Sequence, residues 1–436
     1  MAHRVVILGG GFGGLSAAQR LGSTSVDVSL IDRRNFHLFQ PLMYQVATGS
    51  LSPGEIAAPL RSVLNRHRNI RVLLGEASEL KPQEQVVILK DGARIEYDSL
   101  VVATGADTSY FGHEAWRRWA PSPKSLEEAT TIRHKVFYAF EAAERSKHAD
   151  AIRTWLTFVI VGAGATGLEL AGALAEIARQ TLRHDFRSIR PQEARIILMD
   201  VATRVLPGYP EDLSAHAARL IGRLGVEIMT QAAVRDIDAT SVTYERNGAT
   251  QRIATKTVLW AGGITASAFG RNVATTTRAE TDKAGRIKAN ADLTIAGFPN
   301  IYVLGDLALT FRPDGRPLPG VAQVAIQQGA YAAKAIRARS AGATEVPAFR
   351  YFDKGDMAVI GRAAAVANIF GIHVWGLPAW LIWLFIHLMY LVEFQSRILV
   401  FIQWGFLYLT DSRGARLITG PGSPDLPDCT SEATDL

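Results

Sequence analysis

The sequence predicts an α/β protein with two Rossmann-like dinucleotide-binding domains and a C-terminal pair of apolar helices. Two glycine-rich motifs support this prediction, GGGFGG at residues 9–14 and GAGATG at residues 162–167. Each follows an apolar run typical of a strand and opens a segment typical of a helix, the arrangement in which helix N–H groups hold a pyrophosphate. A third observation, the apolar stretch 375–392, distinguishes the end of the chain.

The first domain is expected over residues 1–115. In its motif Gly9 permits the tight turn, Gly11 lets a pyrophosphate approach the main chain, and Gly14 lets the helix pack on the strand. Asp32 ends the next apolar strand, 23 residues beyond Gly9. That separation is near the spacing of about 20 at which a carboxylate binds a ribose hydroxyl. A purely structural role, in which Asp32 only ends its strand, stays open.

The second domain is expected over residues 116–275 and begins with a connector. Ser125 and Glu128 form a capping-box pattern that predicts the start of a helix there. The second glycine motif repeats the three positions of the first. Asp200 ends the second strand expected in this domain and is the counterpart of Asp32. A purely structural role for Asp200 also stays open.

Residues 276–340 are expected to return the chain to the first domain. An apolar strand there runs into Gly305 and Asp306, which suits an aspartate that meets the ribityl chain or phosphate of a flavin. The helix that follows carries Gln323 and Gln327 one turn apart, so both side chains can address one ligand. Its positive N-terminus would stabilise negative charge on a reduced flavin. Two dinucleotide motifs are most economically explained by a bound flavin and a visiting nicotinamide.

Composition excludes several classes of protein. The formal net charge is +6 at pH 7, but no dense Lys/Arg block with interleaved aromatic residues indicates nucleic-acid binding. Cys429 is the single cysteine, which excludes a disulfide within the chain, cysteine-ligated zinc and a redox-active dithiol. The ten histidines lack ligand spacing, so no metal site is expected. A strand is expected directly from residue 3, so no signal peptide is expected.

Residues 341–410 differ in character from the rest of the chain. Residues 375–392 are almost entirely apolar, and a second apolar stretch covers 398–409. A run of about 18 apolar residues is at the lower limit for a membrane-spanning helix, and frequent aromatic side chains are typical of the water–lipid boundary. We expect membrane-associating helices that anchor the protein, followed by a flexible tail over 411–436. A core helix or a dimer interface stays open.

Longer motifs resemble the type II NADH:quinone oxidoreductases. They are DRRNFHLFQPLMYQVATG at 32–49, GLELAG at 167–172, AQVAIQQG at 322–329 and KGDMAVIGR at 354–362. The resemblance covers nearly the whole chain up to residue 410. It implies a single-subunit enzyme with non-covalent FAD that passes electrons from NADH to membrane quinone without pumping protons. Residue 200 is Asp where the family often has Glu.

The resemblance also implies roles for single residues. Glu169 is expected to relay a proton or orient the nicotinamide, and Gln323, Gln327 and Lys354 are expected at the quinone. A plain first-turn carboxylate for Glu169 and a surface lysine for Lys354 stay open. The residues expected to bind the cofactors are Gly9, Gly11, Phe12, Gly13, Gly14, Asp32, Arg33, Gln45, Thr104, Gly105, Gly162, Gly164, Thr166, Gly167, Asp200, Gly262, Gly305, Asp306, Ala322 and Gln323.

The function expected from all of this is hydride transfer from NADH to FAD and two-electron reduction of quinone. The expected location is the cytoplasmic face of the inner membrane, as a peripheral protein in contact with quinone and the bilayer surface, while a homodimer stays open. One alternative is a soluble NAD(P)H-dependent flavoprotein reductase of a ferredoxin-like partner, which would not need the apolar helices. Another is a slowly turning flavin redox sensor, which an intact nicotinamide site and a quinone pocket argue against.

Overall fold

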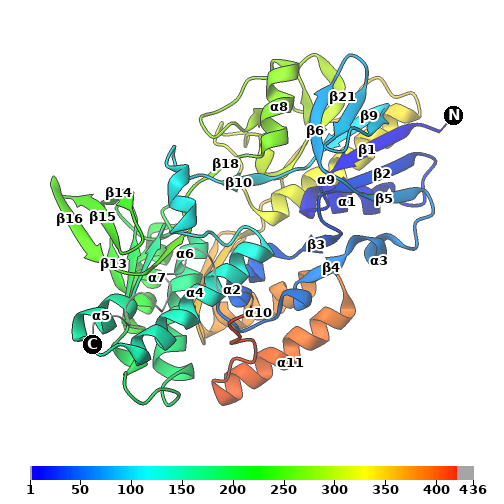
Figure 1. Ribbon diagram of the computed structural model, residues 1–436. Coiled ribbons are helices and arrows are strands. Elements are labelled where there is room, and N and C mark those ends of the chain that lie inside the picture. The colour runs from blue at the N-terminus through cyan, green and yellow to red at the C-terminus, as the bar shows by residue number, and fades with distance from the viewer. Residues whose placement is uncertain (1, 420–436) are drawn as a thin grey trace. The chain divides into compact units, whose positions relative to one another are not determined.

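The computed structural model describes residues 2–419, which form two compact units (Figure 1). The first unit takes the chain up to Leu38, then Ala57–Asp107 and Ile264–Asp353. The second takes Phe39–Ile56, Thr108–Gly263 and the chain from Lys354 onward. This grouping departs from the expected boundaries because Phe39–Ile56 packs with helices of the second unit and because the first unit continues past residue 340.

The first unit is built on a six-stranded sheet in the order β20-β21-β9-β1-β2-β5. All neighbouring strands are parallel except the β20–β21 pair. Because β21 pairs with β9, a late segment of the chain completes the sheet that the N-terminal residues begin. The strands are β1 (Arg4–Leu8), β2 (Asp27–Asp32), β5 (Ile70–Leu74), β9 (Ser99–Val102), β20 (Thr294–Ile295) and β21 (Phe298–Val303).

Helices α1 (Phe12–Leu21) and α9 (Ala322–Ser340) lie side by side in this unit (Figure 1). They approach closely because Gly329 has no side chain, and a Cβ there would collide with the carbonyl oxygen of Gly13. On one face of the sheet, apolar side chains such as Leu8 and Val303 form a core with residues of α8. The other elements are β3 (Phe36–Leu38), β4 (Ala57–Pro59), α3 (Leu60–Leu64), β6 (Ala77–Lys81), β7 (Val86–Leu89), β8 (Arg94–Glu96), β10 (Ala106–Thr108), β18 (Ile264–Ala266), α8 (Ala268–Thr277), β19 (Ile287–Lys288) and β22 (Ala308–Leu309).

The second unit contains a parallel sheet in the order β13-β12-β11-β17 and an antiparallel sheet β14-β15-β16. The helix predicted from the capping box begins as expected, since the Ser125 hydroxyl accepts a hydrogen bond from the N–H of Glu128 at 3.2 Å. The elements are α2 (Met43–Ala47), α4 (Leu126–Arg145), α5 (Ala149–Trp155), β11 (Thr157–Val161), α6 (Ala165–Glu176), β12 (Arg195–Met199), α7 (Glu211–Arg223), β13 (Glu227–Met229), β14 (Ala232–Ile237), β15 (Ser241–Arg246), β16 (Ala249–Ala254) and β17 (Thr257–Trp260).

The end of the chain adds an antiparallel sheet and two helices to the second unit. The sheet consists of β23 (Gly355–Gly361), β24 (Ala364–Ile369) and β25 (Ile372–Gly376). The helices are α10 (Leu377–Tyr390) and α11 (Phe394–Thr410). Among residues 2–419, no helix combines the length and the apolar character that crossing a membrane would require.

The expected flexible tail over residues 411–436 needs correction at its start. Arg413 is only 3% exposed, the N–H of Ala415 donates to the carbonyl oxygen of Gly49 at 3.1 Å, and Arg416 pairs with Asp185 at 2.5 Å. These contacts hold the chain after α11 against the second unit. Residues 420–436, with Cys429, lie outside the described residues.

Candidate functional site

The first glycine loop joins β1 to α1. Gly9 has φ of +102°, and a Cβ there would collide with the main chain of Ala103. A Cβ on Gly14 would collide with the carbonyl oxygen of Gly9. Gly11 differs, because its backbone is extended and a Cβ would meet no protein atom within 4 Å. A glycine that the fold does not require, facing open space at a helix N-terminus, fits a ligand that lies against the main chain.

The second glycine loop, between β11 and α6, repeats this arrangement. Gly162 has φ of +107°, and its Cβ would collide with the main chain of Ala261. A Cβ on Gly167 would collide with the carbonyl oxygen of Gly162, whereas one on Gly164 would meet nothing within 4 Å. Both loops therefore have one open position, at the residue that precedes the helix.

Asp32 anchors the first loop. Its carboxylate accepts hydrogen bonds from the N–H of Gly10 at 2.5 Å and of Arg34 at 2.7 Å. His37, which the sequence analysis did not select, supports the same peptide, since Nδ1 lies 2.8 Å from the carbonyl oxygen of Gly10. Burial lowers the pKa of His37, so the neutral ring donates through Nδ1. Its place within the motif 32–49 was the only sequence signal for this role.

Asp200 anchors the second loop in the same way. It accepts hydrogen bonds from the N–H of Ala163 at 2.5 Å and of Ala202 at 2.7 Å. The nearby Arg204 donates to two carbonyl oxygens of its own loop, at 3.1 and 3.0 Å. That guanidinium is therefore engaged locally, which limits its use for a 2′-phosphate.

The turn at Gly305 and Asp306 is held from α9. Gly305 has φ of +66°, and its N–H donates to Oε1 of Gln328 at 2.7 Å. The amide nitrogen of Gln328 donates in turn to the hydroxyl of Thr310 at 3.1 Å. Gln328 is fully buried and positions the turn that carries Asp306. Gln328 lies in the motif at 322–329, but its sequence position alone did not indicate this role.

Gln323 and Gln327 stand one turn apart near the start of α9, and no side chain caps that helix. Both amide atoms of Gln327 bind the main chain of Phe352: Nε2 donates to the carbonyl oxygen and Oε1 accepts from the N–H, each at 2.9 Å. Gln327 thus holds the segment around Phe352 in place. This use differs from direct binding of quinone, the role expected for it.

Two residues expected at a site pack instead against the C-terminal helices. Gln45 is 3% exposed, its Nε2 donates to the hydroxyl of Tyr44 at 2.9 Å, and its Oε1 accepts from the indole of Trp404 at 2.7 Å. Lys354 Nζ donates to the hydroxyl of Tyr390 at 3.0 Å. In this structure both side chains fix helices of the second unit.

Glu169 stands one turn into α6, beside β23. Burial raises the pKa of its carboxyl well above the ordinary value, and a hydrogen bond from the main chain of Val359 opposes that rise. It borders a hollow between α6, β23 and α11. The lining residues are Tyr44, Gln45, Ser50, Glu169, Ala173, Glu176, Val359, Ile360, Gly361, Arg362, Leu407, Tyr408 and Arg413.

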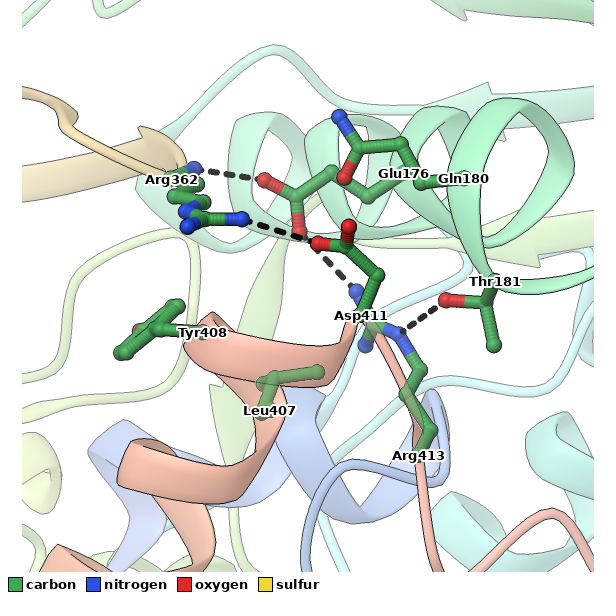
Figure 2. Close-up of a pocket in the computed structure, with 8 residues that line it drawn as sticks. All are labelled: Glu176, Gln180, Thr181, Arg362, Leu407, Tyr408, Asp411 and Arg413. Atoms are coloured by element: carbon green, nitrogen blue, oxygen red, sulfur yellow. Dashed lines mark hydrogen bonds and ion pairs between the residues drawn. The ribbon is translucent and has the colours of Figure 1, made fainter.

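An ion-pair cluster lies at the other end of that helix face. Figure 2 shows Glu176 between Arg362 and Arg413. Glu176 accepts from the N–H of Arg362 at 2.5 Å and pairs with Nη2 of Arg413 at 3.0 Å, while the Arg362 guanidinium pairs with Asp411 at 2.9 Å. Sequence reasoning missed this cluster, because its members lie in separate segments and no local motif joins them.

The expected site residues divide between the two units. Within residues 2–419, no group of three or more His, Cys, Asp or Glu side chains is arranged to hold a metal ion. The first unit holds Gly9, Gly11, Phe12, Gly13, Gly14, Asp32, Arg33, Thr104, Gly105, Gly305, Asp306, Ala322, Gln323 and Gln327, and the second holds Gln45, Gly162, Gly164, Thr166, Gly167, Glu169, Asp200, Gly262 and Lys354.

Comparison with solved structures places the fold. The chain is similar to NDH2 from Plasmodium falciparum in complex with NADH, with a TM-score of 0.86, 19% identity, and coverage of 96% of this chain and 100% of that one. It is also similar to the sulfide:quinone oxidoreductase of Aquifex aeolicus, with a TM-score of 0.72, 17% identity, and coverage of 96% and 93%. At these identities the likeness concerns the fold alone.

Sequence comparison is more specific. The chain is 45% identical over 423 residues to the type II NADH:quinone oxidoreductase Ndh of Mycobacterium tuberculosis, covering 96% of this chain and 90% of the relative. It is 44% identical to NdhA of the same organism, covering 96% and 89%. A sequence model of the pyridine nucleotide-disulphide oxidoreductases matches residues 3–329. This chain therefore belongs to the pyridine nucleotide-disulphide oxidoreductase family and, within it, to the type II NADH:quinone oxidoreductases.

Proposed function

We propose that this NADH:quinone oxidoreductase holds one non-covalent FAD on the first glycine loop and receives NADH on the second. The supporting observation is the open position in each loop, at Gly11 and at Gly164, where a side chain would meet no protein atom. No side-chain hydrogen bond caps either helix, and the N-terminus of a helix favours the negative charge of phosphate oxygens. Bound FAD supplies the ability to accept a hydride from NADH and to pass two electrons to quinone.

The chain's own residues would then bind and orient the two nucleotides. Asp32 and Asp200 each hold their glycine loop in shape and offer a carboxylate to a ribose hydroxyl. Asp306, on the turn fixed by Gln328, would bind the ribityl chain or phosphate of the flavin. The uncapped N-terminus of α9 favours negative charge on a reduced flavin.

At the quinone we propose four residues: Glu169, Gln323, Gln327 and Lys354. Gln327 and Lys354 act through neighbouring segments of the chain. Glu169 would exchange protons through its carboxyl, and Gln323, in the first turn of α9, would bind quinone. Gln327 acts through the segment at Phe352, and Lys354 acts through its contact with Tyr390 on α10.

Membrane contact is proposed for one side of α10 and α11. Large apolar side chains on both helices are exposed to solvent, in contrast to the buried Trp383 and Trp404. Such two-sided helices lie in the interface of a bilayer rather than across it. We therefore place the protein as a peripheral enzyme on the cytoplasmic face of the inner membrane. The exposed residues are Leu377, Leu381, Phe385, Met389, Tyr390, Phe394, Ile398, Leu399, Phe401, Ile402, Phe406 and Leu409.

Spectroscopy of the purified protein tests the proposal. The protein should be yellow and should release FAD when it is denatured. Anaerobic NADH should bleach the flavin, and a short-chain quinone should restore its colour. A colourless protein that gains no bound flavin on incubation with FAD would contradict the proposal.

A further inference from the structure

Three residues of α6 share one face of the helix: Glu169, Ala173 and Glu176, at positions i, i+4 and i+7. The face packs closely against β23, because Gly172 has no side chain and a Cβ there would collide with the carbonyl oxygen of Ile360. Ala173 lies between the two glutamates on this face and carries only a methyl group. The hollow lies over this face and is lined by both glutamates.

A second, smaller hollow lies beyond Glu176 (Figure 2). The two hollows share the lining residues Glu176, Arg362, Leu407, Tyr408 and Arg413. The outer hollow is also lined by Gln180 and Asp411, and the Asp411 side chain is 46% exposed. The two hollows therefore meet at Glu176, and together they extend from the half-exposed Asp411 to Glu169.

The charges around Glu176 suit a carboxyl that gains and loses a proton. Arg413 and the N–H of Arg362 bind it directly, with Asp411 next to Arg362 and Tyr408 on the facing helix α11. Burial raises the pKa of Glu176 more than these cations lower it.

At the inner end, Glu169 interacts electrostatically with the phenols of Tyr44 and Tyr209. Burial raises the pKa of both phenols, so neither competes for protons near neutral pH. Glu169 is therefore the group at the inner end of the path that can receive a proton from Glu176.

The reaction requires one proton from water in every turnover. NADH supplies two electrons and one proton, whereas reduction of a quinone to a quinol takes two electrons and two protons. The second proton must enter from the aqueous phase. We propose that Glu176 takes up this proton at the surface and passes it through water in the two hollows, over Ala173, to Glu169. This proposal rests on the proposed function, which requires a proton at the quinone.

Two substitutions interrupt the path in different ways. Glu176→Gln removes the outer carboxyl, and Ala173→Leu fills the inner hollow while the ion pair of Glu176 with Arg413 stays intact. In stopped-flow measurements, oxidation of the reduced flavin by quinone should slow on the order of tenfold at pH 8 in both variants. The loss should be smaller than that of a direct proton donor, since some water still reaches Glu169. The defect should shrink toward pH 5.5, and KM for quinone should not change.

Two control variants accompany these. Glu176→Asp keeps a carboxyl and should restore most of the rate. Glu193→Gln removes an exposed carboxyl of the same unit, paired at 3.8 Å with Arg190, and should behave as wild type. If Ala173→Leu instead raises KM for quinone at every pH, the hollow binds quinone and the proposed proton path is wrong.

A measurement without turnover gives an independent readout. Infrared titration of the resting protein should show a carboxyl that protonates above the ordinary range and is missing in Glu176→Gln, and hydrogen–deuterium exchange of the Glu169 carboxyl should slow in Ala173→Leu. Unchanged infrared bands together with wild-type pH profiles would overturn the proton path alone. Failure of NADH to reduce the wild-type flavin would instead overturn the proposed function.

Discussion

At the scale of the residue, each nucleotide loop contains glycines of two kinds. Gly9 and Gly162 have positive φ and no room for a Cβ, so the fold itself requires glycine there. Gly11 and Gly164 have extended backbones and open space, so folding does not require glycine at these positions. The motif spacing predicts both kinds alike, and only the packing around them separates a folding role from a ligand role.

Valine at the open positions should therefore separate binding from folding. Gly11→Val should fold normally yet weaken FAD binding by about two orders of magnitude, the effect of losing roughly 3 kcal/mol of contacts. Gly164→Val is the matched control, which should keep its FAD and lose NADH-dependent bleaching. Flavin content and thermal unfolding of both variants measure this. Loss of flavin from both variants, or from neither, would contradict the assignment of the loops.

Asp200 should set the preference for NADH over NADPH. Its carboxylate repels a 2′-phosphate, and Arg204 is engaged with carbonyl oxygens of its own loop. Asp200→Ser should narrow the ratio of kcat/KM values for the two nucleotides by roughly tenfold, about 1.4 kcal/mol. It should also lower kcat/KM for NADH, because the N–H of Ala163 loses its acceptor. Equal use of both nucleotides by the wild type would refute this role.

The ionised carboxylate of Glu169 should destabilise the folded protein at alkaline pH. The pKa of Glu169 in the folded protein lies above the ordinary value of 4.5. The carboxyl therefore does not destabilise the folded state below about pH 4.5, and it lowers the free energy of unfolding as the pH rises through the folded pKa. Glu169→Gln should therefore raise Tm relative to wild type at pH 8 and leave it unchanged near pH 4.5. Turnover should fall on the order of a hundredfold while FAD stays bound. A variant that is less stable at pH 8 would show that the carboxylate is stabilising.

At the scale of the element, α10 and α11 have two different faces. Trp383 is 1% and Trp404 4% exposed, and Trp404 donates to Gln45, whereas Phe385 and Phe401 are 66% and 64% exposed. The helices are thus part of the second unit as well as an apolar surface. Removing them would uncover Gln45 and leave Glu176 without Arg413, so truncation does not isolate their role at the membrane.

Charges on the exposed face should release the protein without unfolding it. Phe385→Glu with Phe401→Glu removes two phenyl rings from lipid, worth about 1.5–3 kcal/mol each. Binding to lipid vesicles should weaken by at least about a hundredfold, with unchanged Tm and unchanged reduction of the flavin by NADH. Leu74→Glu, on an exposed leucine of the first unit, is the control and should leave vesicle binding intact. Persistent binding of the double variant would assign this face to a protein contact.

Local patterns predicted the elements around both loops, since turn glycines, apolar strands and the Ser125 cap act over a few residues. They did not predict contacts across long separations. The pair of Glu176 with Arg413 spans 237 residues, and the bond of Gln45 with Trp404 spans 359. Such partners are brought together by how helices pack, which residue spacing alone does not report.

At the scale of the whole molecule, each unit is assembled from separated stretches of chain. The sidedness of the protein on the membrane is a property of the entire chain, and the single cysteine offers one chemical handle for it. A membrane-impermeant maleimide should label Cys429 in inside-out vesicles and not in intact cells, and Cys429→Ser should remove the signal. Labelling in intact cells would mean that the C-terminal region crosses the membrane.

The contacts of Arg413 with Glu176 and of Ala415 with Gly49 have a consequence for biosynthesis. Glu176 and Gly49 leave the ribosome long before their partners, which lie 237 and more residues later. A chain released before residue 413 leaves Glu176 without its ion-pair partner Arg413, and breaking a buried ion pair costs about 3–5 kcal/mol. Such a loss shifts a protein toward degradation in the cell. Chains that contain Arg413 and Ala415 should therefore be degraded more slowly in the cell than chains that terminate before them.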